Sequence, residues 1–166
     1  AMVLAGGTDA MVEINMGHRR PSAVISVSRI PELRSWTYDI AAGDSSPPRL
    51  RIGAGVTYAE IETEPLSTWV PALGQAARTV GSPQIRNRGT IGGNLGTSSP
   101  AGDALPPLLL DGAEVECASV RGDRSIPIGE FVTGVKRNAL AADELITAVR
   151  LSPSGAPQTF MKVGPR

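Results

Sequence analysis

The sequence predicts an α+β protein in which a small parallel β/α part is followed by an antiparallel sheet with helices. Two observations predict this class. The first 27 residues run in the order strand, glycine turn, helix and strand, and strand patterns dominate again after residue 112. The 166 residues include 19 Gly and 14 Pro, which lie at element boundaries throughout the chain. Short elements joined by many loops are therefore expected.

The parallel part begins with an apolar run, Met2–Leu4, that ends in glycines and so predicts a strand followed by a tight turn. Thr8 or Asp9 can cap the helix that comes next, and Gly17 is expected to end it. Residues 23–27 have the composition of a buried strand. Because two strands joined by a helix usually pair in parallel, these two strands are expected to be neighbours.

A boundary between two subdomains is placed near residue 45, where the turn residues of 44–48 lead into a short strand at 50–54. The first subdomain is then 1–45 and the second is 46–166. The first one starts directly on a strand, so it is expected to be incomplete at its N-terminus.

Helix signals follow that strand. Thr57 and Glu60 have the spacing of a capping box, so a helix is expected to start at Tyr58 and to stop before Pro65. A second helix, with apolar residues at helical spacing on one side, is expected to end at Gly81.

The last third of the chain combines one more helix with several strands. Asp103 can cap a short apolar helix over 105–110, which Gly112 closes. The apolar runs beyond it predict an antiparallel sheet. Its predicted strands are 113–117, 124–128, 145–151 and 158–163.

Composition argues against several functional classes. The 16 Lys and Arg residues balance 16 Asp and Glu residues, so charge gives no reason to expect a nucleic-acid or membrane-surface partner. No apolar run approaches the roughly 18 residues of a membrane span, and the first residues lack the pattern of an export signal. Cys117 is the single cysteine, which excludes a disulfide or a cysteine-ligated iron–sulfur cluster within this chain. A cytoplasmic setting is expected.

Nucleophilic hydrolase chemistry is not expected either. His18 is the single histidine, and it follows a glycine at the end of a predicted helix. This leaves no basis for a Ser-His-Asp or Cys-His arrangement. We assign His18 no role.

Two glycine motifs carry most of the information about function: Ala5–Asp9 and Thr90–Asn94. Each places paired glycines beside a threonine, so that backbone amides can approach an anion without a Cβ in the way. The candidate donors are the amides of Gly6, Gly7, Thr8, Gly92, Gly93 and Asn94, with the hydroxyl of Thr90. Two such motifs predict one large ligand that carries phosphate, although turn geometry without a ligand explains a single glycine pair equally well.

Other side chains leave two interpretations open. Arg86 and Arg88 can contact phosphate, bridge the subdomains or face a partner. Trp36, Trp69 and Tyr58 can stack on an aromatic ligand, although spaced aromatics usually serve packing.

The motifs continue over longer segments at 84–95, 99–103 and 160–166. They read Gln-Ile-Arg-Asn-Arg-Gly-Thr-Ile-Gly-Gly-Asn-Leu, Ser-Pro-Ala-Gly-Asp and Phe-Met-Lys-Val-Gly-Pro-Arg. With Ala-Gly-Gly-Thr-Asp at 5–9, these segments resemble the FAD-binding subunit or domain of the molybdenum hydroxylases. That family includes the xanthine dehydrogenases and the medium subunit of carbon monoxide dehydrogenase, and the resemblance covers almost the whole chain.

The resemblance implies the two-subdomain FAD-binding fold of the vanillyl-alcohol oxidase (PCMH) type, with FAD between the subdomains and the family's C-terminal domain absent. It implies that Val80 lines the adenine or ribose end, that Asp103 bonds a ribityl or ribose hydroxyl, and that Ile146 and Lys162 line the remaining wall. No catalytic residue and no metal ligand is expected in this chain. The residues implied around the diphosphate are Val3, Leu4, Ala5, Gly6, Gly7, Thr8, Asp9 and Ala10 on one side and Thr90, Ile91, Gly92, Gly93 and Asn94 on the other.

The resemblance also implies an FAD-dependent oxidoreductase subunit. Its partners are expected to be a molybdopterin-binding large subunit, which oxidises substrate, and a [2Fe–2S] small subunit, from which electrons reach an acceptor through FAD. Asp103 can alternatively serve as a helix cap alone. Two other functions are weighed: a stand-alone flavin oxidoreductase of the same fold, and a non-enzymatic ligand-binding or assembly module.

Overall fold

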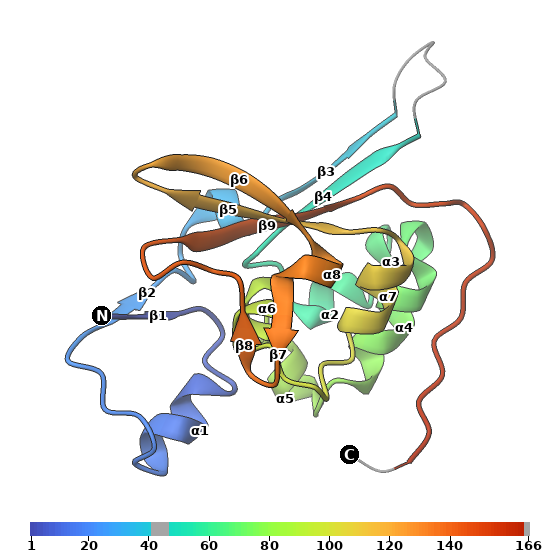
Figure 1. Ribbon diagram of the computed structural model, residues 1–166. Coiled ribbons are helices and arrows are strands. Elements are labelled where there is room, and N and C mark those ends of the chain that lie inside the picture. Colours follow the sequence, from blue (N-terminus) through green and yellow to red (C-terminus); the bar gives the residue numbers. More distant parts are fainter. Residues whose placement is uncertain (41–46, 165–166) are drawn as a thin grey trace.

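The computed structural model describes residues 1–40 and 47–164 and arranges them in two parts (Figure 1). A small lobe holds the first two strands and the first helix. The larger body is a five-stranded sheet over a layer of short helices. The α+β class predicted from the sequence is confirmed.

The small lobe is the predicted parallel unit. β1 (Met2–Leu4) and β2 (Val24–Ser26) pair in parallel, with Val3 opposite Ile25, and α1 (Ala10–Asn15) connects them. The predicted burial of residues 23–27 is wrong for β2, because every residue of β2 is exposed, whereas Val27 just beyond it is buried. Apolar residue type alone indicated burial there, whereas no second layer among the described residues covers this two-stranded sheet.

The sheet of the body is antiparallel, as predicted, and its strand order is β3-β4-β9-β5-β6. β3 lies before the boundary predicted near residue 45 and pairs with β4 beyond it. The boundary itself falls at 41–46, outside the described residues, and the division of the chain there stays a prediction. The strands are β3 (Trp36–Asp39), β4 (Arg49–Gly53), β5 (Glu114–Ser119), β6 (Gly122–Pro127) and β9 (Leu145–Leu151).

One face of this sheet is buried against the helices and forms the core. Leu50, Ile52, Val115 and Val149 lie on that face and are fully buried. The helices that cover it are short, as the many glycines and prolines predicted. They are α2 (Tyr58–Ile61), α3 (Leu66–Trp69), α4 (Pro71–Thr79), α5 (Pro83–Arg86), α6 (Ile91–Thr97), α7 (Leu105–Leu110) and α8 (Ile128–Phe131), with a 3₁₀ turn at Pro31–Leu33 and a hairpin of β7 (Val132–Gly134) and β8 (Arg137–Asn138).

The capping box at the start of α2 is confirmed. The amide of Glu60 donates to Thr57 Oγ1 over 3.3 Å, and the amide of Thr57 donates to the Glu60 carboxylate over 2.8 Å. The helix predicted to end at Gly81 is instead divided into α3 and α4. Pro71 causes the break because it has no N–H to continue α3, yet it fits the first turn of a new helix.

The strand predicted at 158–163 is wrong. After β9 the chain runs down beside α4 and α7 without joining a sheet (Figure 1). Side chains hold it there: Gln158 Nε2 donates to Asp111 Oδ1 over 2.6 Å, and the amide of Phe160 donates to Gln75 Oε1 over 2.8 Å. These bonds to helix side chains take the place of a strand ladder.

None of the helices within residues 1–40 and 47–164 combines the length and the apolar character that a membrane crossing needs.

Candidate functional site

The two glycine motifs lie against each other, although 80 residues separate them in the sequence. A Cβ built on Gly6 would lie 1.8 Å from the carbonyl oxygen of Arg88, so the first motif touches the chain just before the second. A Cβ built on Gly93 would lie 3.9 Å from the Cβ of Ala5. The structure thus brings the two motifs together, and their binding of one ligand stays a prediction.

The first motif presents free backbone donors. Among the described residues, the amides of Gly6, Gly7 and Thr8 have no hydrogen-bond acceptor. The left-handed backbone of Gly7, with φ of +80°, turns the chain from β1 toward α1. Asp9 occupies the N-cap position of α1 but its side chain makes no capping bond, so the predicted capping by Thr8 or Asp9 is not seen.

The second motif is not a loop but the first turn of α6, with Thr90 at the N-cap. The amide of Gly93 donates to Thr90 Oγ1 over 3.0 Å, and that of Gly92 donates to the carbonyl of Ala54 over 2.9 Å. The amide of Asn94 donates to the Thr90 carbonyl over 3.0 Å. In this structure helix formation and packing already use all three amides, and their contact with phosphate stays a prediction. The Thr90 hydroxyl still has a hydrogen to donate.

The paired glycines of this turn have different surroundings. A Cβ on Gly92 would lie 2.5 Å from the Cβ of Ala54 and 2.8 Å from its carbonyl oxygen, so Gly92 lets α6 pack on the end of β4. A Cβ on Gly93 would meet only Thr90 Oγ1 at 3.0 Å and Ala5 at 3.9 Å. The bare side of Gly93 thus faces the first motif, where a ligand between the motifs would pass.

Asn94 adds an unsatisfied acceptor in the same region. Its Oδ1 atom is buried and has no hydrogen-bond partner among the described residues. A buried carbonyl without a donor is unfavourable by about 1–3 kcal/mol, so a hydroxyl or N–H of a ligand fits here. A Cβ built on Gly102 would lie 3.1 Å from this oxygen, so the Asn94 side chain lies against the segment that follows α6.

Asp103 and Lys162, which the resemblance placed on the ligand wall, bind each other. Lys162 Nζ lies 2.9 Å from both carboxylate oxygens of Asp103, and Thr79 Oγ1 donates to the same carboxylate over 3.0 Å. Ala104, not Asp103, is the N-cap of α7, so the cap alternative for Asp103 is excluded. The structure thus brings together two residues that are 59 positions apart in the sequence.

Val80 and Ile146 belong to the hydrophobic core of the body, with 8% and 6% of their surfaces exposed. Val80 ends α4, and Ile146 of β9 reaches toward Gly96 of α6. In the lobe, Val3 is about half exposed. Contact between these side chains and a cofactor stays a prediction.

The sequence left the roles of several arginines and aromatic residues open. In the structure Arg86 forms an ion pair, and Trp36 and Trp69 pack against each other. Arg86 Nε lies 3.0 Å from a Glu62 carboxylate oxygen, which ties α5 to α2. Tyr38 stacks on Trp69 with ring centroids 4.1 Å apart, and Trp36 meets Trp69 edge-on at 5.3 Å. These rings pack on one another between β3 and α3.

A hollow of about 630 Å³ lies elsewhere, on the sheet face that the helices leave open. Its cations are paired: Arg51 Nε lies 2.8 Å from Glu116, and Arg150 binds Glu114. The hydrogen bond from Arg150 lowers the pKa of the Glu114 carboxyl. Its charges are balanced and no residue of the glycine motifs lines it, so this hollow does not extend the candidate site.

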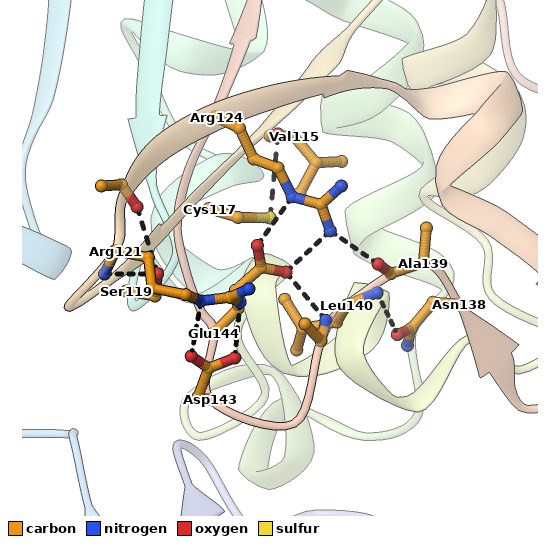
Figure 2. Close-up of polar contacts among 12 residues, drawn as sticks. Val115, Cys117, Ser119, Arg121, Arg124, Asn138, Ala139, Leu140, Asp143 and Glu144 are labelled. Carbon is orange, nitrogen blue, oxygen red and sulfur yellow. Dashed lines mark hydrogen bonds and ion pairs between the residues drawn. The ribbon is translucent and has the colours of Figure 1, made fainter.

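The strongest pKa shift also lies away from the glycine motifs. Figure 2 shows Arg124 and Arg121 of the β5–β6 hairpin reaching Glu144 and Asp143, which precede β9. The hydrogen bond from Arg124, helped by the amide of Ala141, lowers the pKa of Glu144 to about 2. Burial raises the pKa of the neighbouring Cys117 thiol, which therefore is not a reactive thiolate. This cluster fastens the hairpin to the rest of the sheet.

Sequence reasoning missed the polar residues of the β7–β8 hairpin. Asn138 Nδ2 donates to the carbonyl of Gly96 over 3.0 Å and to Ser98 Oγ over 3.1 Å, at the C-terminal end of α6. No local signal could have identified these contacts, because the Gly96 and Ser98 partners of its Nδ2 lie 40 or more positions away.

Comparison with known families gives one model match, described as the FAD binding domain in molybdopterin dehydrogenase, over residues 1–153. The FAD subunit of nicotinate dehydrogenase from Eubacterium barkeri is 43% identical over 151 residues, which are 89% of this chain and 49% of that protein. The xanthine dehydrogenase FAD-binding subunit of Escherichia coli O157:H7 is 36% identical and covers 92% of this chain and 51% of its own length. The chain thus spans about half the length of the curated relatives it matches.

Solved structures give the same picture. Carbon monoxide dehydrogenase from Hydrogenophaga pseudoflava superimposes with a TM-score of 0.84 at 27% identity, covering 91% of this chain and 50% of the other. Quinoline 2-oxidoreductase from Pseudomonas putida 86 superimposes with a TM-score of 0.82 at 27% identity, covering 92% and 51%. The arrangement of lobe and body is therefore shared with these enzymes.

Proposed function

We propose that this chain is the FAD-binding electron-transfer component of a multicomponent molybdenum hydroxylase. The premise is that the chain belongs to the family of FAD-binding domains of molybdopterin dehydrogenases. FAD is the cofactor that this family membership assigns to it. The observation that best supports the proposal is the contact between the two glycine motifs, one from the lobe and one from the body.

We propose further that the fold is of the vanillyl-alcohol oxidase type, with FAD between lobe and body. The amides of Gly6, Gly7 and Thr8 would hold the diphosphate, because these donors have no acceptor among the described residues. Gly93 would let the cofactor pass close to α6.

The remaining contacts follow from donors and acceptors in the same region. The Thr90 hydroxyl would donate to the ligand, and Asn94 Oδ1 would accept from one of its hydroxyl or N–H groups. Val80 would line the adenine or ribose end, Asp103 would bond a ribityl or ribose hydroxyl, and Ile146 and Lys162 would line the remaining wall. Bound FAD supplies the redox chemistry, and the chain needs to position it and to shape its electrostatic surroundings.

The wider assembly is also a proposal. A molybdopterin-binding large subunit would oxidise the substrate, and a [2Fe–2S] small subunit would deliver electrons to this chain, which passes them to an acceptor in the cytoplasm. Support comes from the relatives, which are named as FAD subunits of dehydrogenases. Substrate choice would then reside in another polypeptide.

FAD titration of the purified chain, followed by flavin fluorescence and absorbance, tests the proposal. Wild-type protein should bind FAD stoichiometrically. Gly93→Val should weaken binding by about 100-fold, close to 3 kcal/mol, because its side chain fills the space toward Ala5. Gly129→Val is the matched control: it adds the same side chain to α8, where a Cβ has ordinary contact with Leu109 at 3.7 Å, and it should bind FAD like wild type.

Absence of FAD binding by the wild-type chain, both alone and with full-length partner subunits, would contradict the proposal. Turnover by the isolated chain with a soluble electron donor would favour the stand-alone flavin oxidoreductase. A bound flavin that cannot be photoreduced would favour the non-enzymatic module.

A further inference from the structure

The β7–β8 hairpin touches both helices that follow the glycine motifs. α1 comes after the first motif, and α6 begins with the second. The hairpin lies beside α6 and faces the lobe (Figure 1). One residue at its tip, Lys136, makes a contact in each direction.

On the body side, the hairpin is fixed to the C-terminal end of α6. The amide of Lys136 donates to the carbonyl of Ser98 over 2.9 Å, and Asn138 Nδ2 donates to Gly96 and Ser98. Ser98 is buried, with 1% of its surface exposed and a left-handed φ of 47°. The hairpin therefore completes the end of α6 and moves with it as one unit.

On the lobe side, the Lys136 side chain reaches α1. Lys136 Nζ donates to Glu13 Oε1 over 3.0 Å, and Glu13 also lies 3.2 Å from Arg19 inside the lobe. The hydrogen bond from Lys136 is the main cause of a lowered pKa at Glu13, to which Arg19 and His18 add smaller effects. The Glu13 carboxylate is thus charged at neutral pH, and it binds one cation of the lobe, Arg19, and one of the body, Lys136.

The backbone at Lys136 supports a side-chain role. Its φ of 52° lies in the left-handed region, which a glycine or asparagine adopts more easily than lysine. The lysine at this hairpin tip therefore has an unfavourable backbone conformation, and such conformations often occur at functional positions.

We propose that Lys136 is a positioning residue that sets the orientation of the lobe, and with it the free amides of the first glycine motif, relative to α6. This rests on the proposed function, because those amides are the proposed diphosphate donors. The lobe meets the body at Ala5, Gly6 and Thr8, all before α1, and at Glu13 within α1. The Glu13 contact therefore adds an attachment point on the helix itself to those on the first glycine motif.

The test compares three variants of the full chain. Lys136→Met removes the charge, Lys136→Arg keeps it, and Arg19→Met removes the other cation beside Glu13 without touching the link between lobe and body. FAD affinity is measured by fluorescence titration. Hydrogen exchange of the segment from Gly6 to Asn15 is measured without FAD, so that one readout does not depend on the cofactor.

Lys136→Met should weaken FAD binding about three- to five-fold, the range expected for one exposed ion pair, and should speed exchange in the segment. Lys136→Arg and Arg19→Met should match wild type in both measurements. An unchanged exchange rate in Lys136→Met would overturn the inference, even if wild type binds FAD. Equal effects of Lys136→Met and Arg19→Met would overturn it too, because Glu13 would then act only within the lobe. Failure of wild type to bind FAD would instead contradict the proposed function, and hydrogen exchange would still decide the role of Lys136.

Discussion

The two glycine motifs look alike in sequence but differ in what they leave free. Both combine a glycine pair with threonine, and both lead into a helix. In the first motif the amides of Gly6 and Gly7 have no acceptor among the described residues. In the second, the amides of Gly92 and Gly93 are both used inside the protein.

The position of threonine relative to the glycines explains part of this difference. Thr90 precedes its glycine pair, so it becomes the N-cap and its hydroxyl oxygen accepts from the third residue of the helix. Thr8 follows its pair, so the glycines lie before α1 and outside its first turn. The cap accounts for the Gly93 amide, whereas the Gly92 amide is used by the carbonyl of Ala54, which is distant in sequence.

The largest difference in the free energy of unfolding is expected between substitutions of the two paired glycines of α6. Gly92→Ala should lower the free energy of unfolding by about 3 kcal/mol, because its Cβ would overlap the backbone of Ala54. Gly93→Ala should leave the thermal unfolding midpoint nearly unchanged. Equal midpoints in both variants would mean that Gly92 does not serve packing.

Gly6→Ala tests the contact between the motifs. A Cβ 1.8 Å from the Arg88 carbonyl oxygen must push lobe and body apart, so FAD affinity should fall by at least about ten-fold while the body keeps its cooperative unfolding. Fluorescence titration and circular dichroism measure the two effects, with Gly96→Ala as the control. Wild-type affinity in Gly6→Ala would show that the contact is dispensable.

A smaller effect distinguishes the two N-caps. Thr90→Ala should lower the free energy of unfolding by about 1 kcal/mol, because the Gly93 amide loses its acceptor. Asp9→Ala should change it by roughly 0.3 kcal/mol or less, because the Asp9 side chain makes no capping bond. Urea unfolding of both variants measures the difference. A larger loss in Asp9→Ala would reverse our assignment of the caps.

The smallest effect concerns pH. Because the pKa of Glu13 is lowered in the folded protein, its bond to Lys136 is fully present above the unfolded value of about 4.3 and is lost as pH falls through the lower folded value. Lys136, Arg19 and His18 are the charged groups that face it. Hydrogen exchange around the first motif, corrected for intrinsic rates, should therefore rise at acid pH. Exchange at the Thr90 cap, which contains no titrating group, should not follow the same curve.

Much of the fold was predictable because its signals are local. The capping box at Thr57, the apolar helix at 105–110 and the strands at 50–54 and 145–151 depend on residues close in sequence. The failures have a common cause. The strand at 158–163 and the burial of 23–27 were inferred from composition, and each depends on what the rest of the chain places beside it.

The sequence by itself determined the family, the α+β class and the identity of the two glycine motifs, because a motif is a run of neighbouring residues. Only the tertiary structure decided which amides stay free, because Gly92 finds its acceptor on Ala54, and Asn138 and Lys136 reach α6 from some 40 positions away. Hydrogen bonds are satisfied by whatever lies nearby in space. A local pattern can therefore name the groups that bind a ligand, but it cannot show whether the protein has already used them.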